Sequence, residues 1–267
     1  MKKFLGIFFF LCLSTLLSRL PFFSPPPKLS YEWEVATEKE DGLLTVLTYN
    51  IHHGTDNNDV LRLQEMAALM HDADIVFLSE LDRNFDSRSH FLDELLIFQK
   101  TLGLKYVSFA PTLERIKLFK GYYGIAILSR YPLVKTEIHY LPTDSFKEPR
   151  AAISATILWQ NKEVKIWGTH LSPSLEQQKQ IDYLIISAVG ADLLLGDLNT
   201  KPTDVYRLKA LLNLESADDK PTFPAEFPNS QIDYILYNKR LQLLDVETIS
   251  VTYSDHLPVK ARFKWAQ

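Results

Sequence analysis

Short apolar runs alternate with polar stretches along most of this chain, and their spacing predicts a mixture of strands and helices. Residues 75–79 form a continuous apolar run, which predicts a strand covered on both faces. Similar runs predict the other strands, at residues 43–49, 123–129, 134–140, 151–159, 163–169, 192–195, 231–237, 242–251 and 259–265, with an edge strand at 31–35.

Four segments instead repeat apolar residues at helical spacing, which predicts helices at 59–70, 91–102, 174–189 and 204–212. Asp59 is placed to cap the start of the first helix, and Gly103 is placed to end the second in the C′ position. Helix-linked strands come early and hairpin-like strands come late. This order predicts an α/β (α+β) fold of mixed sheets with helices outside, rather than a purely parallel doubly wound sheet.

The N-terminus has a different pattern. Lys2 and Lys3 precede an apolar run that starts at Phe4, as in an export signal. A cleaved signal peptide and an uncleaved membrane anchor both remain open for residues 1–23. No small-x-small cleavage site is obvious, which slightly favours the anchor, although residues 4–23 reach the length of a membrane span only by including Arg19. The two lysines place the N-terminus inside, so we expect the rest of the chain outside the cytoplasm, membrane-anchored or secreted.

Composition fits one large domain after this leader. Residues 24–42 form a Pro-rich, polar linker, and residues 43–267 contain no second linker or repeat, which predicts a single domain. The chain of 267 residues is 46% hydrophobic, enough for a substantial core, and we expect a monomer.

Its net charge of -4 excludes a global basic field for nucleic acid, so a polyanion would need a local basic patch or a metal ion. The only cysteine, Cys12, lies in the leader, so the domain forms no internal disulfide.

Polar side chains follow the apolar runs in short motifs from residue 48 to residue 256. Acids, amides and imidazoles at strand ends are what a divalent-metal phosphoesterase site needs. Each motif alone also fits an ordinary turn, helix cap or structural ion pair. The evidence for a phosphoesterase site comes from all of the motifs together, in this order. The motifs contain Asn50, Glu80, His170, Asp197, Asn199, Asp233, Asp255 and His256.

Two of these motifs place carboxylates at the rim of a sheet. Glu80 follows an apolar strand, where a carboxylate suits Mg²⁺, or is simply a solvated loop acid. Asp197 and Asn199 alternate around Leu198, so both polar side chains point to one side. Aspartate can orient and activate water, and an asparagine N–H can stabilise charge on a phosphoryl oxygen. The ordinary alternative is a strand-to-helix turn with capping residues.

The segment around His256 carries the sharpest local signal. Pro258 disfavours helix at Leu257, so Asp255 and His256 lie on an extended or turn segment. A cationic histidine can contact phosphate when a second acid raises its pKa. Asp233 lies in an apolar strand and needs a partner if it is buried, so it is the candidate for that acid. A structural Asp–His pair is the alternative.

The sequence gives weaker evidence that several basic residues bind phosphate or metal. Arg150 is placed to bring a guanidinium to phosphate, or is an exposed residue at the start of a strand. His52 and His53 are not predicted ligands, because adjacent side chains on an extended segment point in opposite directions. Lys117 and Lys120 lie beside tyrosines and are interpreted as a solvated charge cluster rather than substrate-binding residues.

The ordered motifs resemble the endonuclease/exonuclease/phosphatase superfamily, whose members include deoxyribonuclease I-like nucleases, abasic-site endonucleases, neutral sphingomyelinases and inositol-polyphosphate 5-phosphatases. The resemblance runs from about Leu43 to Phe263. It has departures at Ile125, where members often carry asparagine, and at His52, where some nucleases carry an acidic residue. It implies a four-layer α/β sandwich, in which two mixed β-sheets pack face to face with helices outside. His170 stands where abasic-site endonucleases usually have tyrosine, which argues against that branch.

The resemblance also implies roles for individual residues. The metal ligands would be Glu80, Asp255 and Asn50, binding Mg²⁺ with Mn²⁺ as the alternative ion. The catalytic residues would be His170, Asp197, Asn199, Asp233 and His256. The phosphate-binding residues would be Asn50, Arg150, His170, Asn199 and His256.

We therefore expect a divalent-metal-dependent phosphodiesterase or nuclease that acts outside the cytoplasm on nucleic acid or a phospholipid head group. The alternatives are a phosphomonoesterase or a sphingomyelinase-like lipid phosphodiesterase. A non-catalytic, membrane-tethered binding domain ranks below them, because none of the key acids or the terminal histidine is lost. The sequence does not select the substrate.

Overall fold

The structure is a computed structural model that describes residue 39 and residues 42–116, 120–144 and 147–267. The predicted leader, most of the predicted linker and the edge strand at 31–35 lie outside the described residues. Within the part of the chain that the structure describes, no helix is long and apolar enough to cross a membrane.

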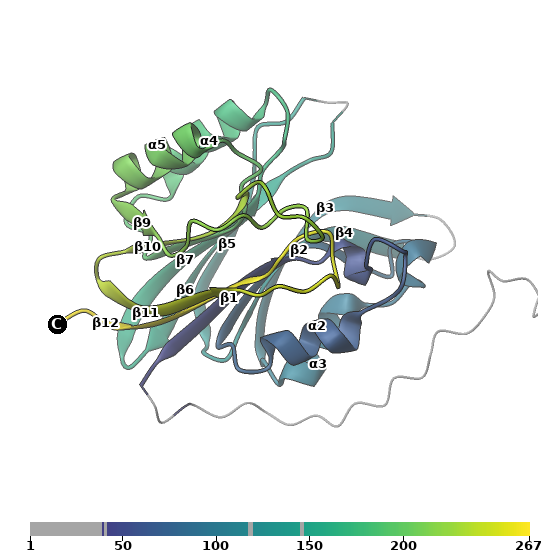
Figure 1. Cartoon of the computed structure of the whole chain (residues 1–267), viewed down its shortest axis with the longest axis horizontal. Helices are drawn as coiled ribbons and strands as arrows, with labels where there is room; N and C mark the ends of the chain where they lie inside the picture. Colours follow the sequence, from purple (N-terminus) through teal and green to yellow (C-terminus); the bar gives the residue numbers. More distant parts are fainter. Residues whose placement is uncertain (1–38, 40–41, 117–119, 145–146) are drawn as a thin grey trace, which may run out of the picture.

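Twelve strands form two six-stranded mixed sheets (Figure 1). The first sheet has the order β11-β12-β1-β2-β4-β3, with bounds β11 Leu241–Thr248, β12 Val259–Trp265, β1 Leu44–Asn50, β2 Ile75–Arg83, β4 Lys120–Ser129 and β3 Tyr106–Ile116. The second has the order β5-β6-β7-β8-β10-β9, with bounds β5 Leu133–Tyr140, β6 Ala151–Trp159, β7 Lys162–His170, β8 Leu193–Asp197, β10 Asp233–Asn238 and β9 Leu214–Ser216. Only the central pairs β1–β2 and β7–β8 are parallel in these sheets, as far as the described residues extend.

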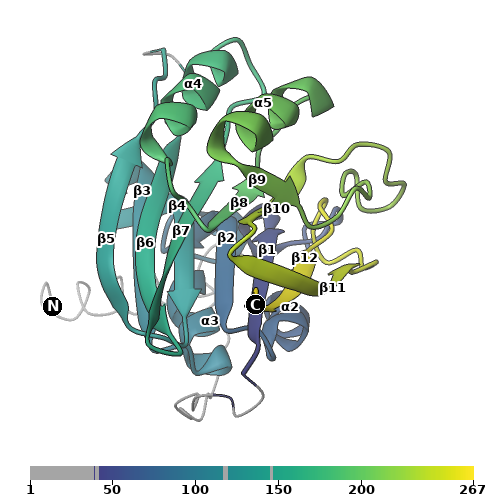
Figure 2. The ribbon, with the colours of Figure 1, turned by 90° about the vertical axis from the view of Figure 1, so that its left-hand side faces the viewer.

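The two sheets pack face to face, and a pair of helices covers the outer face of each (Figure 2). Helices α2 (Leu63–Met70) and α3 (Glu94–Leu102) pack on the first sheet, and α4 (Gln177–Ser187) and α5 (Pro202–Leu212) pack on the second. The predicted four-layer α/β sandwich is therefore confirmed.

Strand β2 shows why its apolar run is continuous. Ile75 and Phe77 belong to the core between the sheets, whereas Val76 and Leu78 belong to the core under α2 and α3. Both faces of the strand are buried over this apolar run, as predicted, because adjacent side chains alternate between the two cores.

Two glycines let the sheets approach closely beside Phe77. A Cβ atom on Gly168 would lie 2.3 Å from the Phe77 ring, and one on Gly196 would lie 1.9 Å from the Thr169 carbonyl oxygen. Gly196 also has a φ of +133°, which side chains disfavour. The close packing brings the ends of β7 and β8 toward the end of β1.

Most predicted elements lie where the apolar pattern places them, with three exceptions. Helix α2 begins at Leu63 after Arg62, not at Asp59, so the predicted cap is wrong. Asp59 lies in a turn with a φ of 58°, because the Asp56 carboxylate accepts the N–H groups of Asn58 and Val60 and forms a competing local structure. Strands β3 and β9 were not predicted, since β3 contains a proline and β9 is short.

We expect the Gly196→Ala substitution to destabilise the fold far more than Gly190→Ala. Both glycines have positive φ, but nothing lies within 4 Å of the Cβ position at Gly190, so that control contains only the backbone cost, about 1 kcal/mol. Steric conflict with Thr169 should add several-fold to this cost at Gly196. Urea unfolding measures the difference, and equal losses for the two variants would contradict the close approach of the strands.

Candidate active site

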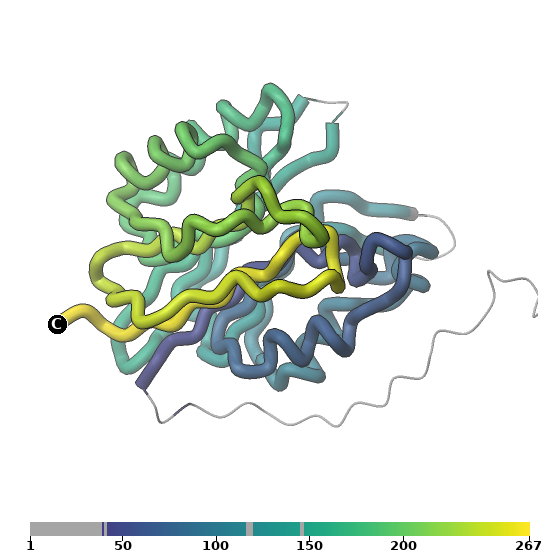
Figure 3. Tube along the Cα trace, in the orientation of Figure 1, coloured from purple at the N-terminus to yellow at the C-terminus, as the bar shows by residue number. Residues whose placement is uncertain are grey.

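The predicted polar residues meet at one edge of the sandwich, where the central strands of both sheets end. Asn50 ends β1, His170 ends β7 and Asp197 ends β8. Asp233 begins β10 directly opposite Asp197 in the antiparallel register. His256 lies in the loop before β12, and this loop passes beside the segment that follows β1 (Figure 3).

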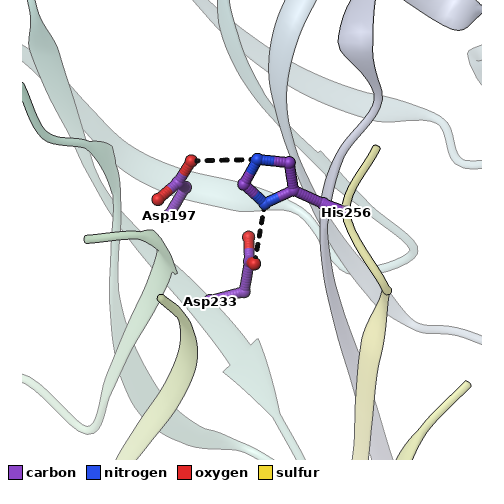
Figure 4. A group of neighbouring side chains, drawn as sticks. All are labelled: Asp197, Asp233 and His256. Carbon is purple, nitrogen blue, oxygen red and sulfur yellow. Dashed lines mark hydrogen bonds and ion pairs between the residues drawn. The ribbon is translucent and has the colours of Figure 1, made fainter. Parts of the chain in front are cut away.

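An acid–imidazole group forms the buried centre of this edge (Figure 4). His256 Nδ1 lies 2.8 Å from Asp233 Oδ2, and His256 Nε2 lies 3.8 Å from Asp197 Oδ2. These three residues are at most 5% exposed. Thr222 Oγ1 donates to Asp233 Oδ2 at 2.6 Å, while Asp233 Oδ1 is buried with no partner among the described residues.

The charges of this group depend on one another. Burial alone lowers the pKa of His256, but the charge and hydrogen bond of Asp233, together with Asp197 and Asp255, raise it to about 10. Burial and the neighbouring charge of Asp233 raise the pKa of Asp197, against the opposing effect of His256. At neutral pH His256 is therefore an imidazolium that partly compensates two buried acids.

Asn50 connects the two sheets through one amide group. Its Nδ2 atom lies 3.1 Å from Glu80 Oε1, 3.1 Å from Asp197 Oδ2 and 3.4 Å from His256 Nε2. Ser254 Oγ donates to the Asn50 carbonyl oxygen at 2.7 Å and accepts from the His256 N–H at 3.2 Å. The position of His256 is thus tied to the end of β1.

Glu80 leaves its strand at a β-bulge. The register between β2 and β4 shifts between Leu78 and Leu81, and Glu80 has a φ of 58°. Asn199 also has a positive φ, of 46°. Left-handed backbone at such residues costs on the order of 1–3 kcal/mol each, and it clusters at functional sites. The bulge releases Glu80 from the alternation of the strand, and its half-buried side chain reaches Asn50.

The other side of the site contains His170, Asn199 and Arg150. Asn199 Nδ2 lies 3.1 Å from His170 Nε2, and the Asn199 N–H donates to Asp197 Oδ1 at 2.9 Å. Arg150 Nη1 lies 2.9 Å from His170 Nδ1. Burial, together with the charges of Arg150 and His256, lowers the pKa of His170 well below its usual value, so this imidazole is neutral.

Asp255 precedes His256 in the chain, and its side chain is half-buried. Its Oδ1 accepts from Ser254 Oγ at 3.2 Å, and its charge raises the pKa of both Tyr49 and His256. Its role as a metal ligand stays a prediction.

The two adjacent histidines adopt a different conformation from the one expected. Residues His52–Gly54 form a short 3₁₀ turn, and the two rings lie 4.2 Å apart, so the expectation of opposite directions was wrong. The reason is that both histidines have a φ of 45° and the segment is not extended. Among the described residues, the metal-ligand cluster that the geometry brings together does not include them.

Lys120 pairs with Glu114 at 2.7 Å and stacks on Tyr122, which fits a solvated charge cluster. Lys117 lies outside the described residues.

Sequence patterns did not reveal several residues around the site. Arg88 forms a two-point ion pair with the buried Asp82 and lies over the Tyr123 ring at 5.2 Å, and its pKa is affected by the Glu80 charge. Glu148 lies 3.0 Å from Arg150. No pattern distinguishes Arg88 from the other arginines of the chain, because its importance arises only when its loop folds back toward Glu80.

The donor set fits a divalent cation. Asp197, Asp233 and His256 each offer one ligand atom within 4.8 Å of the others. His256 has a raised pKa and its Nδ1 is bonded to Asp233, so its imidazolium form is not a metal ligand. The carboxylates outnumber this single buried cation, and Asp233 Oδ1 has no partner among the described residues. Oxygen donors of this kind suit Mg²⁺ or Mn²⁺.

Comparison with known proteins identifies the family to which the chain is similar. The model of the Endonuclease/Exonuclease/phosphatase family matches residues 47–256. The comparison with curated proteins finds no match.

Solved structures share the fold at low sequence identity. An endonuclease/exonuclease/phosphatase from Beutenbergia cavernae is 22% identical with a TM-score of 0.71, over 84% of this chain and 72% of that one. A mannosyl-6-phosphatase from Bacteroides thetaiotaomicron is 16% identical with a TM-score of 0.65, over 83% and 100% of the two chains. D. rerio TDP2 in complex with a single-strand DNA product is 16% identical with a TM-score of 0.63, over 84% and 100%.

The backbone at Glu80 should reverse the usual order of alanine and glycine stability. Both Glu80→Ala and Glu80→Gly remove the carboxylate and its hydrogen bond. Glycine normally lowers stability relative to alanine, but at a φ of 58° we expect Glu80→Gly to be the more stable variant by about 1 kcal/mol. Urea unfolding in the presence of a chelator tests this, and a less stable glycine variant would contradict the left-handed conformation.

Proposed function

The chain belongs to the endonuclease/exonuclease/phosphatase family, whose members hydrolyse phosphoester bonds, and on this premise we propose that it is a divalent-metal-dependent phosphodiesterase. The observation that carries the proposal is the convergence of Asn50, Asp197 and His256 on one buried point, with Glu80 beside it. The metal would be Mg²⁺, with Mn²⁺ as the alternative, held by Glu80 and Asn50 with support from Asp255. When bound, such an ion supplies Lewis-acid activation of the phosphoryl group.

Asp197 is placed to hold and activate the attacking water. Its raised pKa brings it closer to neutral pH, where a carboxylate is a more effective general base. Asn199 is fixed by its N–H bond to Asp197, and its side-chain amide already donates toward His170. That amide also donates to the Leu171 carbonyl oxygen, so it would stabilise charge on a phosphoryl oxygen by exchanging its contact with His170 for one with the substrate.

The two histidines have complementary protonation states. His256, oriented by Asp233, is a cation and would bind a phosphoryl oxygen or protonate the leaving oxygen. His170 is neutral and would accept or donate a hydrogen bond at the phosphate without adding charge. Arg150, whose Nη1 atom contacts the His170 ring, would supply a second positive charge.

A diester ranks first because the adjoining cleft is small. This cleft is lined by Tyr123, Glu148, Arg150 and His170 among others, and the volume in it that is open to a water molecule is about 0 Å³. Pockets that enclose a small-molecule ligand typically have about 300–1,000 Å³. A phosphodiester within a larger molecule, such as nucleic acid or a phospholipid, would instead lie across the open edge of the sandwich.

A phosphomonoesterase is the second candidate, on a specific observation. The positive charges of Arg88 and Arg150 both act on Glu148 and Tyr123 in the wall of the cleft, and two cations suit a phosphate that carries two charges. The mannosyl-6-phosphatase with the same fold belongs to this class.

We expect hydrolysis of bis(4-nitrophenyl) phosphate by the full chain with Mg²⁺, and loss of activity when the ion is chelated. Asp197→Asn and Asn199→Ala should each reduce kcat about 10²–10³-fold, because each removes one group that acts on the reacting atoms. The exposed Asp182→Asn is the matched control and should retain activity.

Comparison with 4-nitrophenyl phosphate separates the two candidates, since both compounds release the same leaving group. Faster hydrolysis of the monoester would favour the phosphomonoesterase. Activity that survives chelation would refute the metal mechanism, and an inert chain with both compounds and Mg²⁺ would refute the proposed chemistry.

We also propose that the domain acts outside the cytoplasm, as a monomer, anchored through residues 4–23 if they are not cleaved. Support comes from the sequence alone, in the basic pair Lys2–Lys3 before the apolar run. A protease added to intact cells should digest a C-terminal tag on the full chain. Complete protection of the tag, with digestion after lysis, would contradict this location.

A further inference from the structure

Next to the site, one edge of β2 has no neighbouring strand among the described residues between Ser79, where the pairing with β1 ends, and Arg83, which forms an isolated bridge with Asp93. Strand β1 pairs with β2 only as far as Asn50 opposite Ser79, whereas β2 continues to Arg83 with β4 on its other side. The bulge that carries Glu80 lies in this unsupported stretch. Backbone donors on such an edge need another partner when they are buried.

Glu94 supplies that partner from the first turn of α3. Its side chain is fully buried, and its Oε2 atom accepts the Asp82 N–H at 2.8 Å. The Asp82 carboxylate is occupied separately by Arg88 and Ser89. Glu94 therefore provides the hydrogen-bond acceptor that a neighbouring strand would otherwise provide for Asp82, two residues after Glu80.

The other oxygen of Glu94 lies against the turn that follows Asn50. A Cβ atom on Gly54 would lie 2.8 Å from Glu94 Oε1, so the carboxyl group fills the space that a side chain at this turn would need. Oε1 forms no hydrogen bond among the described residues, so its contact with the turn is one of packing. In the same turn, the His52 N–H donates to Asn50 Oδ1 at 3.1 Å. This bond directs the Nδ2 atom of Asn50 toward Glu80 and Asp197.

We propose that Glu94 is a positioning residue for the metal-binding edge, holding the Glu80 bulge with one oxygen and supporting the Asn50 turn with the other. The inference rests on the proposed function in taking Glu80 as a metal ligand, with the Asn50 Nδ2 donor orienting its carboxylate. Groups that orient ligands from behind typically change metal affinity about 10–100-fold when they are lost.

Burial and the nearby Asp82 charge raise the pKa of the Glu94 carboxyl group well above its usual value, which favours its protonated form. Glutamine keeps an oxygen acceptor in the same place, whereas methionine keeps a similar volume without one. The variants Glu94→Gln and Glu94→Met therefore separate the hydrogen bond from packing.

The test is Mn²⁺ binding to the full-length chain, measured by isothermal titration calorimetry, with kcat determined against Mg²⁺ concentration in parallel. We expect Glu94→Met to weaken Mn²⁺ binding about 10–100-fold. It should raise the Mg²⁺ requirement while kcat largely recovers at saturating metal. Glu94→Gln should bind Mn²⁺ close to the wild-type value.

A matched control is Asp192→Ala, at the opposite end of the second sheet. Asp192 is also buried and accepts a backbone N–H, from Lys165 at 2.9 Å, so its loss should lower stability without changing Mn²⁺ affinity. Wild-type Mn²⁺ affinity in Glu94→Met would overturn the inference. So would equal weakening in Glu94→Gln, or in Asp192→Ala.

The same measurements distinguish failure of this inference from failure of the proposed function. A wild-type chain that binds Mn²⁺ but hydrolyses no phosphoester would refute that function, while the ratio of Mn²⁺ affinities would still support the positioning role of Glu94.

Discussion

Like charges face each other where the two sheets end, since Asp197 and Asp233 are paired in register and both are buried. Two carboxylates in a dry environment repel one another and favour proton uptake unless cations or donors compensate them. His256 supplies one positive charge, and the Asn50 amide supplies a hydrogen bond to Asp197. The remaining negative potential makes this edge suited to a divalent cation and to a phosphate that such a cation brings.

Local strain and close packing maintain this arrangement. The positive φ of Glu80 and of Asn199 would not persist in a flexible loop. Glu80 lies within β2 and Asn199 follows β8, and the core side chains of both strands are fully buried. Gly196 allows β8 to approach β7, so that Asp197 lies beside His170. The strained backbone at this edge thus lowers the stability of the fold, as is common at functional sites.

The sequence predicted the fold well where burial is two-sided or strictly alternating. The strands at 151–159 and 259–265 have the bounds predicted, and the Asp233–His256 pair is in contact. Prediction failed where tertiary contacts replace local pattern. The Asp56 turn displaces the expected cap, and the His52–Gly54 turn departs from an extended segment. Glu94 resembles any acid in the first turn of a helix, and its contact with β2 depends on how α3 packs.

The most direct test of the account is the position of a bound metal ion. Crystals of the domain soaked in Mn²⁺ would give an anomalous difference peak at each ordered ion. The account predicts a peak at the edge formed by Glu80 and Asn50, on the side that faces Asp197. An active protein whose only ordered Mn²⁺ lies away from these residues would contradict it.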